Sequence, residues 1–394
     1  MRRKLLHLLL LPLICGLAAK EAAPNVACRD ENGAVVDWFY MYKLPRIHTQ
    51  YGARRNSSGF NYLYITSNSY DAWRLSTHEV TSTESMPGKL LQRLFDDERV
   101  LLVAYNDQKP NSNSSTPKAH AKGLLATDGA TAVWLVHSVP RYPEIPVYKY
   151  PLTGGRYGQS FLCMSLQGSE VDKVATQLRL MVPLIYYKRT PEAVLARFPI
   201  LQQVVAGKWQ REAPFQNKVK LATLGGTKFK SFAKSGKVVT ELYEDVIAPS
   251  LDVNLLVETW RNGGGNLETN CTRSDKVYNI KEIKEQLLQI AFNTTSDHSK
   301  WAVSQESGFQ LWRWRIGGGD WLCVGDINRQ RDQLVRGGGS VCLKNSKVAQ
   351  LYRQLIQGYE PCPRQSKIIN EANKSVSRRS KISLSTCLRT YVCI

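Results

Sequence analysis

The sequence predicts a mixed α/β protein with the length of about two domains, or of one large domain with two similar halves. Its 394 residues are 43% hydrophobic, which is ordinary for a globular chain and enough for a substantial core. Runs rich in β-branched and aromatic residues, typical of strands, alternate with runs whose apolar residues recur at helical spacing. Both kinds of run occur before and after the middle of the chain.

The expected elements of the first part begin with a strand at residues 35–44. This run is rich in β-branched and aromatic side chains and ends at Pro45. A helix is expected at 88–97, where four apolar residues have helical spacing (Leu90, Leu91, Leu94 and Phe95). The remaining expected elements are strands at 61–66, 100–105, 119–126, 131–139 and 157–166, and a helix at 171–181.

In the second part, helices are expected at 190–201, 280–292 and 349–358, and Pro191 suits the first turn of the first of these. Strand patterns cover 228–235, 320–328 and a segment that runs through Cys342. Residues 245–257 mix helix and strand signals and stay open. Three consecutive glycines make 261–266 a loop.

A hairpin is the most informative local prediction. Asp128 and Gly129 form a strong turn signal between the strands at 119–126 and 131–139. If these two residues form the turn, His120 lies directly opposite His137, with their Cβ atoms about 4.5–5.5 Å apart. Lys122 then shares their face of the sheet. A one-residue slip or a bulge would remove this arrangement.

The two ends of the chain differ in composition from its body. Arg2, Arg3 and Lys4 precede an apolar run to Leu17, which predicts a signal peptide at 1–19 with cleavage up to residue 23. No later stretch reaches the ~18 apolar residues that a membrane span requires. Residues 363–394 carry seven Lys and Arg against Glu371 alone, and we expect this basic tail to be disordered.

The chain is strongly basic, with 53 Lys and Arg against 33 Asp and Glu and a net charge of +20. Removal of the signal peptide takes away three basic residues, and the body remains basic without the tail. Such a surface suits a polyanion, either nucleic acid or an anionic membrane. The alternative is a basic surface that serves only solubility.

Cysteines and glycosylation sequons indicate an exported protein. Cys15 leaves with the signal peptide, and an oxidising lumen favours disulfides among the other eight cysteines. Zinc is less favoured, because no C-x-x-C or H-x-x-x-H pair exists. Five sequons predict surface glycosylation, at Asn56, Asn113, Asn270, Asn293 and Asn373.

Two His-x-Lys triplets carry the candidate chemistry. One is His120-Ala121-Lys122 and the other is His298-Ser299-Lys300, although the sequence has only six histidines. In a strand, this spacing points both side chains to one face. One imidazole can attack phosphorus, the other can donate a proton, and the lysines can bind phosphate oxygens. A single triplet of this kind would be a chance event in a basic protein. Downstream lies Asn328, whose amide could hold a phosphate oxygen.

These motifs resemble the deoxyribonuclease II family of lysosomal acid endonucleases, in the phospholipase D superfamily. The resemblance spans residues 28 to about 362. It is carried by Val36-Asp37-Trp38-Phe39, Tyr42-Lys43-Leu44-Pro45, Tyr105-Asn106-Asp107, His120-Ala121-Lys122-Gly123, Trp134-Leu135-Val136-His137-Ser138-Val139-Pro140, Tyr157-Gly158-Gln159-Ser160, Phe232-Ala233-Lys234, Asp297-His298-Ser299-Lys300-Trp301 and Cys323-Val324-Gly325-Asp326-Ile327-Asn328-Arg329.

The resemblance implies two phospholipase D-like α/β halves, 20–185 and 186–362, each with a mixed sheet flanked by helices. A pseudo-twofold axis relates the halves, and the active site lies where they meet. One histidine attacks phosphorus to give a phosphohistidine, the other protonates the leaving 5′-oxygen, and water releases a 3′-phosphate. The resemblance also implies the disulfides Cys28–Cys163, Cys271–Cys362 and Cys323–Cys342.

The catalytic set implied by the matching motifs is His120, Lys122, His298 and Lys300. We favour His120 as nucleophile and His298 as general acid, although the sequence does not fix this order. Asn328 and His137 are expected to bind the substrate phosphate or to orient the site. No metal and no cofactor are expected, since no cluster of acidic residues has the spacing of a two-metal site. The expected substrate is double-stranded DNA with little sequence specificity.

The chain departs from the family pattern in three places. Ala302 replaces a cysteine, and the tail holds the additional Cys387 and Cys393. Residues 305–320 form an insertion between His298 and Asn328, with two tryptophans that could stack on bases. Because of this insertion, two alternatives remain: a DNA-binding glycoprotein that has lost catalysis, and a phosphodiesterase acting on another substrate. We expect a lysosomal or secreted location, and a homodimer stays open.

Overall fold

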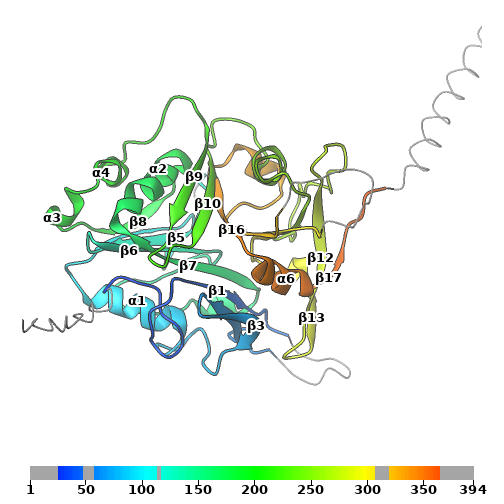
Figure 1. The fold of residues 1–394 in the computed structure, drawn as a ribbon, viewed down its shortest axis with the longest axis horizontal. Coiled ribbons are helices and arrows are strands. Elements are labelled where there is room, and N and C mark those ends of the chain that lie inside the picture. Colours follow the sequence, from blue (N-terminus) through cyan, green and yellow to red (C-terminus); the bar gives the residue numbers. More distant parts are fainter. Residues whose placement is uncertain (1–24, 48–56, 113–116, 307–318, 364–394) are drawn as a thin grey trace, which may run out of the picture.

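A computed structural model of the protein describes residues 25–47, 57–112, 117–306 and 319–363 (Figure 1). The predicted signal peptide, nearly all of the predicted tail and the sequons at Asn56, Asn113 and Asn373 lie outside these residues. The same is true of most of the insertion. Within the described residues, no helix is long and apolar enough to cross a membrane.

The first half of the chain forms an eight-stranded sheet. Its strand order is β3-β2-β1-β7-β6-β5-β4-β8, and all neighbouring strands are antiparallel. The strands are β1 (Trp38–Lys43), β2 (Tyr62–Thr66), β3 (Ser69–Leu75), β4 (Leu101–Tyr105), β5 (Gly123–Thr127), β6 (Thr131–His137), β7 (Gln159–Gln167) and β8 (Ile185–Arg189).

The second half forms a nine-stranded sheet with the order β13-β12-β11-β14-β15-β16-β10-β9, and β17 pairs with β12. Only β11 and β12 are parallel neighbours. The strands are β9 (Gln216–Ala222), β10 (Lys228–Lys234), β11 (Leu255–Glu258), β12 (Val277–Glu285), β13 (Ile290–Asn293), β14 (Trp301–Ser304), β15 (Trp321–Gly325), β16 (Gly338–Lys344) and β17 (Ile356–Tyr359).

The helices are short and lie between the strands along the chain. They are α1 (Met86–Asp96), α2 (Val171–Met181), α3 (Glu192–Leu195), α4 (Pro199–Val205), α5 (Ala248–Leu251), α6 (Ser346–Gln354), the π-helix η3 (Leu242–Ile247) and the 3₁₀ turns η1 (Leu152–Gly155), η2 (Gly168–Glu170), η4 (Thr294–Ser296) and η5 (Arg331–Val335). The N-terminus of α1 is capped by Ser85, whose hydroxyl accepts the N–H of Gly88 at 3.1 Å.

Three apolar clusters build the core around the two sheets. The largest contains side chains from both sheets, including Tyr40 of β1 and Val303 of β14, and therefore lies between them. Phe39, the residue before Tyr40, points to the opposite face and packs with Leu90 of α1. The third cluster covers the outer face of the second sheet, where Phe232 of β10 packs with η3.

Many of the predicted elements are confirmed. The strands expected at 35–44, 61–66, 100–105, 157–166 and 228–235 are β1, β2, β4, β7 and β10, and the helices at 88–97 and 171–181 are α1 and α2. The strand at 320–328 is the shorter β15, and Cys342 lies in β16. The structure is thus a mixed α/β protein with two many-stranded sheets and few helices.

The prediction of a helix at 280–292 is wrong, because these residues form β12, a turn and β13. Ile283 is buried while Lys281 and Lys284 are exposed, and β12 pairs on both sides. The turn is closed by Glu285, whose carboxylate accepts the N–H groups of Leu287 and Leu288 at 2.6 and 2.7 Å. Pairing with three neighbouring strands therefore outweighs the helical spacing of the apolar residues.

The other two C-terminal helix predictions are correct only in part. The segment 190–201 divides into α3 and α4, because Pro199 begins α4 and Phe198 before it has a non-helical backbone. The helix expected at 349–358 is α6, which ends at Gln354, and the chain then enters β17.

The predicted hairpin exists, but its register is wrong. Thr127 pairs with Ala132, so the turn is formed by Gly129 and Ala130 rather than by Asp128 and Gly129. Gly129 takes a φ of 96°, and the Asp128 carboxylate accepts the N–H of Ala130. His137 consequently lies opposite Lys122 and donates its backbone N–H to the Lys122 carbonyl at 3.2 Å.

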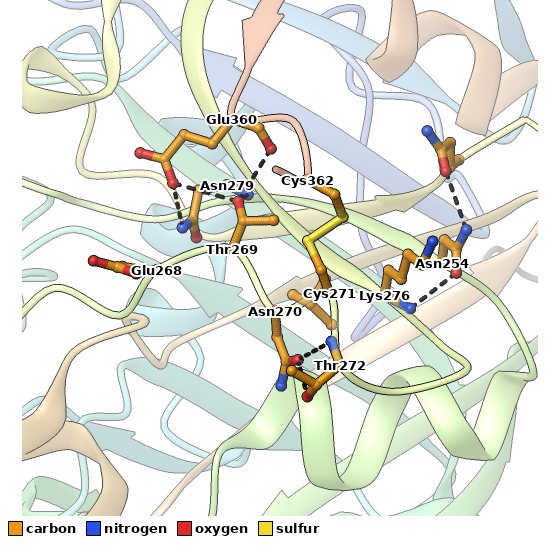
Figure 2. Close-up of a disulfide and its surroundings, with 12 residues drawn as sticks. Asn254, Glu268, Thr269, Asn270, Cys271, Thr272, Lys276, Asn279, Glu360 and Cys362 are labelled. Carbon is orange, nitrogen blue, oxygen red and sulfur yellow. Dashed lines mark hydrogen bonds between the residues drawn. A yellow bond between two sulfur atoms is a disulfide. The ribbon is translucent and has the colours of Figure 1, made fainter. Parts of the chain in front are cut away.

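The three expected disulfides are all present: Cys28–Cys163, Cys271–Cys362 and Cys323–Cys342. Figure 2 shows the second of them, which joins the segment before β12 to the chain after β17. Beside it, Asn279 donates its amide N–H to Glu360 at 2.8 Å. The second half holds two of the disulfides. The Cys271–Cys362 bridge joins cysteines 91 residues apart, whereas the Cys323–Cys342 bridge joins cysteines 19 residues apart.

Two predicted glycosylation sites lie within the described residues. Asn293 is exposed. Asn270 is half-buried, and its side-chain oxygen accepts the Thr272 hydroxyl at 2.9 Å (Figure 2). Its amide donates to Glu244 at 2.8 Å. Glycosylation at all five sequons stays a prediction.

Removal of the Cys271–Cys362 bridge should destabilise the protein by about 2–4 kcal/mol, because the unfolded chain then regains the freedom of a long loop. The measurement is the urea unfolding midpoint of Cys271→Ser, Cys362→Ser and the double variant. All three should lose the same amount, since each removes one bridge. Additive losses in the double variant would show that the bridge is not the cause.

Candidate active site

Both His-x-Lys triplets lie directly before a strand rather than within one. β5 begins at Gly123, next to Lys122, and β14 begins at Trp301, next to Lys300. The strand predicted at 119–126 therefore begins only at Gly123, and the first triplet lies outside it. Each triplet instead leaves its own sheet and contacts the other sheet.

His120 is held by the second sheet. Its backbone N–H donates to the carbonyl of Gly337, the residue before β16, at 2.8 Å. Its Nδ1 lies 2.6 Å from the carbonyl oxygen of Asp326, the residue after β15. A carbonyl only accepts, so Nδ1 carries the hydrogen, and the neutral ring keeps its lone pair on Nε2.

His298 is held by the first sheet in the corresponding way. Its backbone N–H donates to the carbonyl of Gly158, the residue before β7, at 2.9 Å. Its Nδ1 lies 3.0 Å from the carbonyl of Ser138, the residue after β6, and 3.3 Å from Oε1 of Gln159. The two histidines are therefore fixed at the junction of the sheets, each by backbone groups of the opposite sheet.

Lys122 and Lys300 complete the buried cluster of site residues. Lys122 pairs with Asp107 at 2.6 Å. Lys300 donates to the carbonyl of His298 at 2.5 Å, and its Nζ lies 3.0 Å from Nδ1 of the same residue. The side chains of both lysines are almost inaccessible to solvent. Burial, followed by the charge of Lys122, lowers the pKa of Lys300 well below its usual value.

Asp107 is a site residue to which the sequence motifs assigned no role. Its carboxylate lies 3.7 Å from Nε2 of His120 and 3.3 Å from the guanidinium of Arg336. The only available signal was its place in Tyr105-Asn106-Asp107, directly after β4. Trp260 was missed as well, and its ring packs edgewise on His298 with centroids 4.9 Å apart. Thus the carboxylate of Asp107 lies beside His120, and the indole of Trp260 lies beside His298.

Burial and like charge lower the pKa of both imidazoles. For His120, burial acts first and Lys122 next, and together they outweigh the opposing effect of Asp107. For His298, burial is again the first cause, followed by Lys300 and Lys122. Both rings are therefore neutral at pH 7 in the protein without substrate. An anionic phosphate between them would offset the like charges and raise both pKa values.

The pKa values of the two nearby carboxyl groups, Asp107 and Asp326, shift in opposite directions. Burial opposes ionisation of Asp107, but Lys122, His120 and Arg336 outweigh it and hold its pKa below the usual range. Burial raises the pKa of Asp326 to about 8, in spite of Lys122. Asp107 is therefore an anion, whereas Asp326 is a neutral acid in acidic solution.

His137 and Asn328 are the other two predicted site residues. The His137 ring packs on Tyr142 and Phe161 in the outer cluster of the first sheet, and its Nδ1 accepts the N–H of Val139 at 3.2 Å. Burial lowers its pKa to about 3. Asn328 is buried, donates to Gln330 at 3.3 Å, and leaves its Oδ1 without a hydrogen-bond partner. In the described part of the chain, no group of three His, Cys, Asp or Glu side chains could hold a metal ion.

Comparison with known proteins identifies the family of the chain. The family model described as "Deoxyribonuclease II" matches residues 27–362. Deoxyribonuclease-2-alpha of Mus musculus is 33% identical over 349 residues, which cover 86% of this chain and 94% of that protein. Deoxyribonuclease-2-beta of Mus musculus is 33% identical over 92% of this chain and 100% of its own length, and deoxyribonuclease-2-alpha of Rattus norvegicus is 34% identical over 86% and 95%.

The fold and the site, together with these relatives, define a hydrolase of the nuclease class. The chain belongs to the deoxyribonuclease II family.

Proposed function

We propose that the protein is a metal-independent acid endodeoxyribonuclease, which hydrolyses DNA to 3′-phosphate products through a phosphohistidine. The observation that carries this proposal is the pair of imidazoles at the sheet junction. Each is held through Nδ1 by a backbone carbonyl and has a buried lysine two residues on. This arrangement offers two Nε2 atoms and two ammonium groups to a single phosphodiester.

In the first step, the Nε2 lone pair of neutral His120 forms a bond to phosphorus as the bond to the 5′-oxygen breaks. The leaving oxygen takes the Nε2 proton of the His298 imidazolium. Lys122 and Lys300 neutralise the charge that develops on the non-bridging oxygens, a task that a metal ion performs in other nucleases. Asn328 and His137 would orient the phosphate and the hairpin, respectively.

In the second step, neutral His298 accepts a proton from water, and the water oxygen displaces His120 from phosphorus. The 3′-phosphate leaves, and both imidazoles return to their starting protonation states. The depressed pKa of free His120 supports its role as the neutral nucleophile. For His298, bound phosphate and acidic solution both favour the imidazolium that the first step requires.

The matching contacts support two phospholipase D-like halves, 20–185 and 186–362, related by a pseudo-twofold axis. The run β4-β5-β6-β7 and the run β11-β14-β15-β16 have the same order of antiparallel neighbours, and each leads into a helix, α2 or α6. Each triplet precedes the second strand of its run, and each histidine contacts the residues that flank the third and fourth strands of the other run.

The proposed substrate is double-stranded DNA with little sequence specificity. The net charge of +20 favours attraction to a phosphate backbone, and the relatives are named as deoxyribonucleases. The three disulfides fit a protein that folds in an oxidising lumen, and the proposed location is the lysosome, with secretion as the alternative.

Nicking of supercoiled plasmid at about pH 5 tests the proposal. The rate should be the same with and without excess chelator, because the lysines replace the metal. Loss of cleavage in chelator would contradict metal independence. Tight DNA binding without any cleavage would instead indicate a protein that has lost catalysis. Hydrolysis of an activated phosphodiester without DNA cleavage would indicate another substrate.

A further inference from the structure

Two buried lysines outside the proposed mechanism occupy matching places in the two sheets. Lys43 is the last residue of β1, next to β7, and Lys234 is the last residue of β10, next to β16. Both side chains are completely buried. Lysine is rarely buried unless its charge has partners.

Each ammonium donates to the backbone of a loop rather than to a carboxylate. Lys43 donates to the carbonyls of Gly154, at 2.6 Å, and of Tyr157. Lys234 donates to the carbonyls of Gln333, Leu334 and Arg336 at 2.9, 3.0 and 2.6 Å. Both loops contain a short 3₁₀ turn, η1 or η5, and a cation suits the carbonyls at the end of such a turn.

The loops are the ones that hold the catalytic histidines. The Lys43 loop ends at Gly158, whose carbonyl accepts the backbone N–H of His298. The Lys234 loop ends at Gly337, whose carbonyl accepts the backbone N–H of His120. Both glycines approach the opposite half too closely for a Cβ atom, with Asp297 next to Gly158 and Met181 next to Gly337. A small shift of either loop would therefore move one histidine.

We propose that Lys43 and Lys234 are positioning residues of the two half-sites. Lys43 fixes the loop that orients His298, and Lys234 fixes the loop that orients His120. Neither lysine touches the substrate. The inference rests on the proposed function, because it assigns each lysine to one histidine of that mechanism.

Both lysines are charged under acidic conditions. Burial lowers the pKa of Lys43 to about 7, with Asp297 opposing this shift and Arg46 adding to it. Burial lowers the pKa of Lys234 to about 8, with Glu241 and Asp245 opposing and Arg336 adding. At about pH 5 both groups are ammonium ions with three donors each, so the loops are held when the enzyme is proposed to act.

The test compares Lys43→Met and Lys234→Met on two substrates. One substrate is DNA, and the other is a thymidine 3′-(p-nitrophenyl phosphate), whose leaving group departs without a general acid. On DNA each variant should lose about 10²-fold in kcat, the scale of a 1 Å misplacement, with KM nearly unchanged. Lys228→Met removes an exposed lysine from the same strand as Lys234 and should leave both activities unchanged.

The variants His120→Ala and His298→Ala supply the reference patterns with which the two lysine variants are compared. The comparison on the activated substrate uses the first turnover, measured as the burst of p-nitrophenol, because later turnovers still require His298 as the base of the second step. In this first turnover the general-acid variant should recover most of its activity, while the nucleophile variant should not. Lys43→Met should follow the pattern of His298→Ala, and Lys234→Met that of His120→Ala. If one histidine variant recovers and the lysine of its half-site does not, the positioning role is overturned. If neither histidine variant recovers, the proposed mechanism itself fails.

A loss of folded protein would reduce both activities equally. Folding is therefore checked by the urea unfolding midpoint and by the affinity for DNA at the assay pH. If a Met variant does not fold, Lys43→Arg or Lys234→Arg keeps the charge with displaced donors. Lys43→Arg is then expected to lose activity mainly on DNA, and Lys234→Arg on both substrates, each with a smaller loss than the Met variant. An equal loss on both substrates for Lys43→Arg, or a loss on DNA alone for Lys234→Arg, would overturn the proposal.

Discussion

Replacement of His120 or His298 by alanine is expected to reduce DNA cleavage by about 10³-fold or more, because each step of the proposed mechanism requires both imidazoles. The double variant should be little worse than either single variant, since the two groups act as a unit. The measurement is the rate of plasmid nicking at about pH 5 with equal amounts of folded protein.

DNA affinity separates loss of chemistry from loss of binding. The two lysines remain in these variants, so the Kd for a DNA duplex should change little. His78→Ala is the matched control, because His78 lies in a polar loop of the first half and is proposed to have no role. Full activity in either His120→Ala or His298→Ala would rule out the paired-histidine mechanism.

The rate of DNA cleavage is expected to decrease steeply as the pH rises from about 5 to about 8. Burial and lysine charges lower the pKa of His298, so its protonated form is scarce at neutral pH. The general acid must be protonated to act. Because the pKa of His298 is lowered, its imidazolium is available only in acidic solution. Above that pKa, kcat/KM should decrease about tenfold for each pH unit.

The pH profile also has an internal control. With the activated thymidine ester, which needs no acid for its leaving group, the decrease above pH 5 should be much smaller than with DNA. An equal rate on DNA at about pH 5 and about pH 8 would contradict the role of a protonated imidazole.

Local sequence patterns predicted an element correctly where the residues of that element determine its structure. The helix at 171–181 was predicted with its observed ends, since its apolar face and its neighbouring strand patterns agree. The disulfides followed from the family resemblance rather than from spacing. The segment 280–292 shows the limit of such patterns, because its strands depend on pairing with β11 and β17, which lie elsewhere in the sequence.

The candidate site shows the same limit. The two triplets were found because each is continuous in the sequence. Asp107, Trp260, Lys43 and Lys234 were missed as site residues because each acts through a contact with another segment of its own half, which the local sequence around it does not reveal. The prediction placed His137 opposite His120 because it assigned the turn to the wrong two residues. In the structure, Gly129 has a positive φ and is the first residue of the turn.

The stereochemical course at phosphorus tests the central claim most directly. A DNA substrate with a single phosphorothioate of known configuration is cleaved in ¹⁸O-labelled water, and the configuration of the 3′-thiophosphate product is determined. Two successive displacements, first by His120 and then by water, predict net retention. Net inversion would mean that water attacks the DNA directly and would contradict a phosphohistidine intermediate.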